Sequence, residues 1–310
     1  MKNRKILAGV ISVAVVGGIL VTGCSVNKDE TDNSTKAIVA DTQADESEEA
    51  DVTEITTTQE QAQEITINEQ ELVNQDGIVI TAQEYVTDRI MGGGIKLNIQ
   101  NNTQQNITVG CTALIVNNYM ITDLFASNVA AGMQANDNLY LSSRELEAAG
   151  ITNVGKVEIY FHIYDSDNWS KICDPECVTI QTSAYDSMDI VALDDGTELY
   201  NDGGIRIVGK AVDENSFWGS AILLYIENNS GRNVGINAQN MSINGYMVTP
   251  VFSANVYNER MAIDDITILR SELEENGIES IDTVQLSFRI YDSDNFSTIA
   301  ETDTIEFSAR

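Results

Sequence analysis

The clearest pattern in the chain is a strict alternation of apolar and polar residues that occurs twice. Its apolar members are Val157, Ile159, Phe161 and Ile163 in one stretch, and Val284, Leu286, Phe288 and Ile290 in the other. Alternation with a period of two residues and one apolar face predicts a half-buried β-strand. Shorter runs of the same kind predict further strands near residues 78–84, 94–100, 107–116, 119–123, 125–131, 137–141 and 177–183.

The two alternating stretches belong to a duplicated segment. FHIYDSDNWSKI, which begins at Phe161, and FRIYDSDNFSTI, which begins at Phe288, agree at nine of twelve positions and lie 127 residues apart. The same offset aligns NQDGIVI with NDGGIRI, VNNYMIT with INGYMVT and ELEAAGI with ELEENGI, and the match runs without a gap from about Glu71 to Ala309. We therefore interpret the motif as part of a fold that the chain contains twice, rather than as a site that it needs twice.

Turn and helix signals complete the predicted fold. Asn244-Gly245 between two apolar runs predicts a two-residue hairpin. Ser142, followed three residues later by Glu145, predicts a capping box at the start of a short helix that ends at Gly150. Short strands with frequent turns in each copy favour an antiparallel sandwich. The chain is thus predicted to be all-β, with two tandem Ig-like sandwich domains at residues 65–184 and 190–310, each with one short helix.

The N-terminus has the features of an export signal. Basic residues at Lys2 to Lys5 precede fifteen apolar or small residues, Ile6 to Leu20, which as a helix would span about 22 Å. This length is short of the roughly 30 Å hydrocarbon core of a bilayer, so a secretory signal peptide over residues 1–23 is favoured over a permanent membrane helix. An uncleaved anchor is the alternative.

The VTGC sequence that follows ends at Cys24 and resembles the lipobox of bacterial lipoproteins. The resemblance implies that Cys24 becomes the mature N-terminus and carries a diacylglyceryl thioether, which would hold the protein in the cell membrane on its extracytoplasmic face. Residues 24–64 are then predicted to form a disordered acidic tether. Ser25 to Glu64 hold twelve acidic residues and no Pro, Gly or aromatic residue, too little apolar surface to offset chain entropy.

Charge narrows the classes of partner. The formal net charge is -31, and removal of residues 1–23 leaves 14 basic residues against 48 acidic ones. Such a surface repels phosphate backbones, so nucleic acid is not an expected partner. Solubility by itself accounts for the acidic balance, although divalent cations and cationic partners would also be tolerated.

Taken together, the chain resembles bacterial surface lipoproteins of the low-GC Gram-positive type that carry tandem Ig-like extracellular domains. The resemblance covers everything after the tether and rests on the pattern IxNN, VNGYM, ELEExGI and FxIYDSDxW. It implies a domain type and an extracellular location. It supplies no catalytic residues.

The repeated YDSD turn contains the candidate cation ligands, which are Asp165, Asp167, Asp292 and Asp294. An EF-hand is excluded because Trp169 stands at position five, where an oxygen ligand is needed, and Ser170 stands at position six, where Gly is required. A looser cation site remains one interpretation. The other is a turn in which Asp and Asn cap backbone amides while Trp169, or Phe296 in the second copy, folds over the edge of the core.

The remaining reactive residues give no site of ordinary type. His162, the one histidine, lies on the polar face of its strand without a second His or a Cys in register, so we expect a solvated residue rather than a zinc ligand or catalytic base. Cys111 alternates with inward residues and is expected to be buried. Cys173 and Cys177 flank the CDPEC turn, where a disulfide and two free thiols are both compatible with the sequence.

One loop offers an aromatic candidate for partner binding. Phe217 and Trp218 in the second copy correspond to Ile90 and Met91 in the first. An exposed Trp could stack on a sugar or a partner, but apolar residues in both copies favour a loop that covers the end of the core.

Three functional hypotheses follow. The favoured one is a non-catalytic surface lipoprotein that binds a partner or acts as a spacer, with no cofactor and no catalytic residue. A carbohydrate- or cation-binding module of the cell envelope is the alternative, with an unknown surface protein or glycan as its partner. An enzyme that uses scattered carboxylates is the third.

Overall fold

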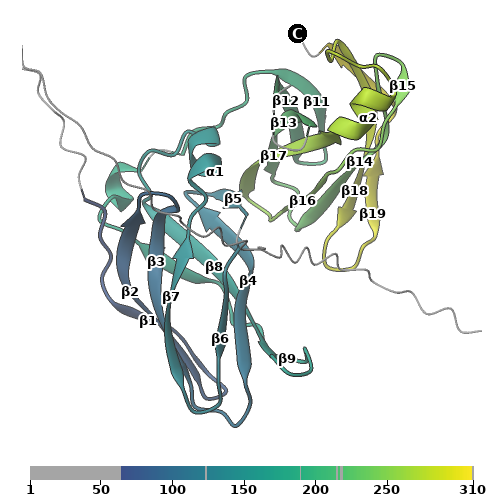
Figure 1. Ribbon diagram of the computed structural model, residues 1–310. Coiled ribbons are helices and arrows are strands. Elements are labelled where there is room, and N and C mark those ends of the chain that lie inside the picture. Colours follow the sequence, from purple (N-terminus) through teal and green to yellow (C-terminus); the bar gives the residue numbers. More distant parts are fainter. Residues whose placement is uncertain (1–63, 123, 189, 214–215, 217–218, 309–310) are drawn as a thin grey trace, which may run out of the picture. The chain divides into compact units, whose positions relative to one another are not determined.

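The computed structural model describes residues 64–308 apart from residues 123, 189, 214–215 and 217–218 (Figure 1). Gln61–Arg310 form one compact unit. The predicted signal peptide, Cys24 and the predicted tether up to residue 63 lie outside the described residues, as does the Phe217–Trp218 pair. Among the residues described, no helix is long and apolar enough to cross a bilayer.

The first copy of the repeat is an antiparallel sandwich. Its strands, in chain order, are β1 (Gln70–Gln75), β2 (Ile78–Asp88), β3 (Gly92–Asn101), β4 (Ile107–Val116), β5 (Tyr119–Ile121), β6 (Ala126–Val129), β7 (Gln134–Tyr140), β8 (Lys156–Asp165), β9 (Lys171–Cys173) and β10 (Val178–Gln181). One sheet has the order β1-β2-β3-β7. In the facing sheet, β4 lies between β8 and β5 and also pairs with β6, while β8 pairs with β9 and β10.

The second copy repeats this plan. Its strands are β11 (Thr197–Asp202), β12 (Ile205–Asp213), β13 (Gly219–Asn228), β14 (Val234–Ile243), β15 (Tyr246–Met247), β16 (Ser253–Val256), β17 (Arg260–Leu269), β18 (Thr283–Asp292), β19 (Thr298–Glu301) and β20 (Ile305–Ser308). The order β11-β12-β13-β17 matches β1-β2-β3-β7, and β14, β15, β16, β18, β19 and β20 match the other sheet.

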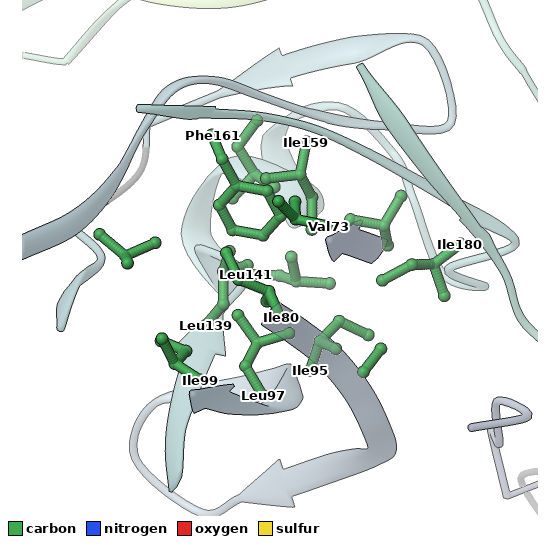
Figure 2. Close-up of a cluster of buried hydrophobic side chains, with 14 of the residues drawn as sticks. Val73, Ile80, Ile95, Leu97, Ile99, Leu139, Leu141, Ile159, Phe161 and Ile180 are labelled. Atoms are coloured by element: carbon green, nitrogen blue, oxygen red, sulfur yellow. The ribbon is translucent and has the colours of Figure 1, made fainter. Parts of the chain in front are cut away.

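Each copy encloses its own hydrophobic core between its two sheets. Figure 2 shows the first core, in which Ile80 and Leu97 from one sheet face Ile159 and Phe161 from the other. All four side chains are at most 1% exposed. Burying a side chain of this size is worth roughly 1.5–3 kcal/mol, so the apolar face of each strand fixes which side turns inward.

Equivalent residues in the two copies make the same hydrogen bonds. Asn117 Nδ2 donates to the Asn153 carbonyl at 2.7 Å, and Asn244 Nδ2 donates to the Ser280 carbonyl at 2.8 Å. The Oδ1 atom of each Asn accepts two backbone N–H groups at the start of the next long strand. The duplication therefore extends from sequence to individual contacts, and the predicted all-β fold of two antiparallel sandwiches is confirmed.

One short helix interrupts each copy, α1 (Ser143–Ala148) and α2 (Arg270–Glu275). The side chain of Ser142 accepts the N–H of Glu145, so the N-cap of the predicted capping box is present, whereas the Glu145 carboxylate accepts the N–H of Thr122 at 2.6 Å. In α2 the equivalent position is Leu269, which has no oxygen to accept that bond and makes no side-chain cap. A 3-10 turn, η1 (Tyr185–Ser187), precedes the connection between the copies.

Most predicted strands are present, with boundaries shifted by a few residues. β1 and β9 were not predicted, because QELVNQ carries little apolar alternation and KIC is only three residues long. The proposed domain boundaries at residues 65–184 and 190–310 stay predictions.

Candidate functional site

The Asp-rich turns use their carboxylates to cap backbone amides. Asp165 is buried, and its Oδ1 accepts the N–H groups of Asp167 at 2.8 Å and Asn168 at 3.2 Å. Asp292 accepts the N–H groups of its own turn, at 3.0 and 3.3 Å. These are Asx turns. The Asp side chain accepts hydrogen bonds from backbone amides of the turn, which have no neighbouring strand to bond with.

The two outer carboxylates of these turns point elsewhere. Asp167 Oδ2 accepts the side-chain amide of Asn106 at 3.3 Å, and Asp294 is exposed. Across the described residues, no group of three or more His, Cys, Asp or Glu side chains is placed to hold a metal ion. The turn interpretation accounts for the buried carboxylates, while cation binding at these turns stays a hypothesis.

The aromatic residue of each turn points into solvent. Trp169 has a φ of 63°, is 73% exposed and stacks on Tyr164 with ring centroids 5.1 Å apart. Phe296 is 70% exposed and stacks on Tyr291 at 6.0 Å. The expectation that these rings fold over the core edge is wrong. Their partners Tyr164 and Tyr291 lie on the outward face of β8 and β18, because they alternate with the buried residues.

His162 has a partner on the neighbouring hairpin. Its Nδ1 lies 2.6 Å from Asp174 Oδ1, and Lys171 Nζ donates to Asp174 Oδ2 at 3.0 Å. Partial burial acts to raise the pKa of Asp174, but the hydrogen bonds and the electrostatic attraction of Lys171 and His162 together outweigh it and hold that pKa below its usual range. His162 remains partly exposed, as expected for the polar face of a strand.

Cys173 and Cys177 are free thiols in the structure. Cys173 is buried and pairs in register with Ile163, which belongs to the core. Cys177 is half-buried and lies beside Tyr160, on the opposite face of β8. The sequence left a disulfide and two free thiols as alternatives. The structure has two free thiols, because the two sulfurs lie on different faces of the sheet. Cys111, expected to be buried, is half-buried.

The loop between β2 and β3 does not cover the core in the first copy. Ile90 is almost fully exposed and Met91 is partly exposed. Asp88 Oδ1 instead accepts the N–H groups of both residues, at 2.7 and 2.8 Å, which directs their side chains outward. The core-cover interpretation is therefore wrong for this copy, and the equivalent Phe217 and Trp218 lie outside the described residues.

Sequence reasoning missed the junction at which one sheet passes from the first copy into the second. β5 pairs in parallel with β17, with Tyr119 opposite Met261 and Met120 opposite Ala262. The N–H of Met261 donates to the Asn118 carbonyl at 3.0 Å. The repeated YM dipeptide after each hairpin was the available signal, but its pairing partner is too remote in sequence to predict.

Side chains reinforce this junction. Tyr119 and Tyr225 meet edge to face with centroids 6.5 Å apart, and Tyr160 meets Tyr257 in the same way at 5.0 Å. The Tyr119 hydroxyl donates to the Val191 carbonyl in the connection. Tyr119 also belongs to a small buried cluster with Ala149, Val208, Tyr225 and Met261. Aromatic pairs of this geometry contribute beyond the area that they bury.

A buried ion cluster crosses the junction. Arg260 Nη2 donates to Glu158 Oε1 at 2.9 Å, and Lys156 Nζ lies 2.9 Å from Glu158 Oε2. The contact with Lys156 is ionic without the geometry of a hydrogen bond, and Arg260 Nε has no partner among the described residues. The cluster thus combines one strong hydrogen bond with two buried polar atoms, Glu158 Oε2 and Arg260 Nε, that have no hydrogen-bond partner among the described residues.

A cavity of about 380 Å³ lies beside the junction, lined by β5, α1, β16 and β17. Asp264 lines it from an inward-facing position of β17, between the buried Ala262 and Ile266. Burial raises the pKa of Asp264 to about 6, against the lowering effect of a hydrogen bond from the Asp265 N–H. Arg144 lines the cavity from α1.

Comparisons with known proteins add little to this description. No protein-family model and no curated protein matches the chain. Among solved structures, the Salmonella enterica SafA pilin in complex with the SafB chaperone matches at 10% identity, over 69% of this chain and 88% of that chain, with a TM-score of 0.21. The calcium binding domain CBD12 of CALX1.1 matches at 10% identity, over 64% and 73%, with a TM-score of 0.16. Scores this low carry no argument about function.

Proposed function

We propose that this protein is a non-catalytic surface lipoprotein. In this account a lipid on Cys24 holds it in the cell membrane on the extracytoplasmic face, and the acidic tether over residues 24–64 carries the two sandwiches away from the bilayer. The proposal rests on the lipobox resemblance, the acidic composition of the tether and the all-β fold of the part that follows it.

The observation that carries the proposal is the junction between the two copies. Parallel pairing of β5 with β17, the buried Arg260–Glu158 bond and the Tyr119 cluster favour two sandwiches that move as one body. A stiff pair is suited to placing a binding surface at a set distance from an anchor, because a hinged pair would spread that surface over many positions. We infer a spacer with a binding face.

A glycan-binding role is the second candidate, and the exposed rings of Trp169 and Phe296 favour it. Trp169 stacks on Tyr164, and Phe296 stacks on Tyr291 in the second copy. The other flat face of each ring is open to solvent. Stacking of a sugar ring on such a face needs no metal and no cavity. An unknown surface glycan or protein is therefore the partner class we propose.

Metabolic labelling with a radioactive fatty acid tests the anchor. The wild-type chain should be labelled and recovered with membranes, whereas Cys24→Ala should be unlabelled. Cys111→Ala is the matched control and should be labelled like the wild type. Equal labelling of Cys24→Ala and the wild type would contradict the proposal.

A glycan array probed with the full chain tests the second role. We expect Trp169→Ala to reduce any signal at least tenfold, because the loss of a stacked ring removes most of the contact. Ile90→Ala removes an apolar side chain that is even more exposed, and it should leave the signal unchanged. Equal binding by Trp169→Ala and the wild type would exclude the Trp169 ring as the platform.

A further inference from the structure

The strand that joins the two copies has an equivalent in the second copy, where the same two residues lie on an open edge. Tyr119 and Met120 form the start of β5, which pairs with β17. Tyr246 and Met247 form β15, whose partner in the described part of the chain is β14 alone. Tyr119 is 1% exposed, whereas Tyr246 is 51% and Met247 67% exposed.

The edge that receives β5 also has an open equivalent. With the offset of 127, Met261 and Ala262 of β17 correspond to Gln134 and Ala135 of β7. Within the described residues β7 is the last strand of its sheet and pairs with β3 only. Gln134 is exposed, and Met133 next to it is 62% exposed. An open strand edge of this kind is a template for pairing with another chain.

We propose that β15 of one molecule pairs in parallel with β7 of a second copy of this chain, in the register that β5 and β17 use within the chain. Tyr246 then lies opposite Gln134, and Met247 lies opposite Ala135. The occupant follows from the duplication, because each half of the internal junction is present a second time with its edge exposed.

In this register the ion pair of the internal junction has neutral equivalents on both sides. Within the chain, the junction buries Arg260 against Glu158. Their equivalents by the same offset are Met133 and Gln285, so the charge is absent on both sides at once. Burial of one charge without its partner would oppose docking strongly, and this register avoids that cost.

The contact between molecules is weaker than the contact within the chain. The side chains that surround Tyr119 include Val208, Tyr225 and Met261, and their equivalents are the polar residues Thr81, Asn98 and Gln134. The net charge of -31 also opposes association. We therefore expect assembly that increases with protein concentration and with added salt, which screens the repulsion.

The predicted contact joins different surfaces of identical molecules. Each molecule offers β15 at one edge and β7 at another, so docking leaves one of each edge open. Such a head-to-tail contact produces an open series of molecules rather than a closed dimer, unless the rotation between neighbours closes a ring.

Site-specific photo-cross-linking of the full chain in intact cells tests the proposal. With p-benzoylphenylalanine in place of Met247, illumination should yield a ladder of dimers and higher species. Mass spectrometry should place the cross-link in the segment from Gln134 to Tyr140. The same probe in place of Phe296, which is equally exposed at the far end of β18, should give no cross-link to that segment.

The reciprocal probe, in place of Met133, keeps the test independent of one substitution. It should cross-link to the segment around Tyr246, and Met247→Lys should remove that product, while Phe296→Lys leaves it. Unchanged melting temperatures of both variants would establish that they fold. Cross-links to a different protein alone, cross-links within a single chain alone, or no product from either probe would overturn the proposal.

Discussion

Arg260 and Glu158, which lie 102 residues apart in the sequence, share a hydrogen bond of 2.9 Å between Nη2 and Oε1 across the junction of the two copies. The Glu158 side chain is almost fully buried, and the Arg260 side chain is mostly so. In such surroundings the attraction of a pair is offset by the loss of hydration, and removal of Glu158 leaves both Arg260 and Lys156 without their carboxylate partner.

The first prediction follows from this asymmetry. Glu158→Gln alone should lower stability by roughly 2–4 kcal/mol, because it leaves Arg260 and Lys156 without their carboxylate, whereas Arg260→Met should cost less, because Lys156 still faces Glu158. The triple variant Arg260→Met, Glu158→Gln and Lys156→Thr installs the residues found at the equivalent positions, Met133, Gln285 and Thr283, and should recover most of that loss. Calorimetric melting temperatures provide the measurement. A triple variant no more stable than Glu158→Gln alone would contradict the compatibility of the neutral residues.

Asp264 gives a prediction about pH. Its pKa of about 6 in the folded chain lies above the ordinary value of 3.8, so the folded state binds more protons between these two values. The contribution of Asp264 to stability is therefore full below pH 3.8 and is lost as the pH rises through 6.

Asp264→Asn removes this dependence. At pH 7 the variant should be more stable than the wild type by on the order of 2–3 kcal/mol, and the gain should shrink as the pH falls toward 4. Asp265→Asn, next to it on β17, is the matched control and should show a smaller gain. Melting curves at several pH values decide the matter, and a gain that does not change with pH would contradict the burial of this carboxylate.

The Asp-rich turns predict matched effects in the two copies. Asp165→Ala and Asp292→Ala each remove an acceptor for two backbone N–H groups, and each should cost about 1–2 kcal/mol. Asn at either position keeps one acceptor oxygen and should cost less. Melting curves with and without calcium complete the test. A clear rise in the wild-type melting temperature with calcium, lost in both Ala variants, would favour the cation interpretation instead.

The thiols predict an order of modification. Cys177 is half-buried and Cys173 is buried, and burial raises the pKa of both thiols. Alkylation at neutral pH should therefore be slow at both and faster at Cys177, and reduction should leave the intact mass unchanged. A mass increase of two daltons on reduction would show that the mature protein has the disulfide after all.

The sequence allowed the fold to be predicted because the fold depends on local patterns. The alternation from Val157 to Ile163 gives the inner face of β8, and the Ser142–Glu145 pair gives the helix start. The exact offset of 127 extended each inference to the second copy. These signals depend on residues that are close in the sequence, so they can be recognised without knowledge of the tertiary structure.

The junction could not be predicted for the opposite reason. Tyr119 and Tyr246 have similar local sequences, VNNYMIT and INGYMVT, yet one is buried and the other is exposed. The difference arises because β17, which is far from β5 in the sequence, pairs with β5 and excludes solvent from the edge of β5. The positions of Trp169 and Ile90 were also missed, because a left-handed turn and an Asp cap direct these apolar side chains outward.

Amide hydrogen exchange of Met261 and Gln134, followed by NMR in one sample, tests the central claim most directly. The claim is that β5 of the first copy pairs with the edge of β17 in the second copy, whereas the equivalent edge of β7 in the first copy stays unpaired. At low protein concentration the Met261 amide, bonded to the Asn118 carbonyl, should be protected like the core. The Gln134 amide, on the open edge, should exchange at least a hundredfold faster. Rapid exchange of both amides would contradict the account, since the two copies would then be separate bodies on a flexible connection.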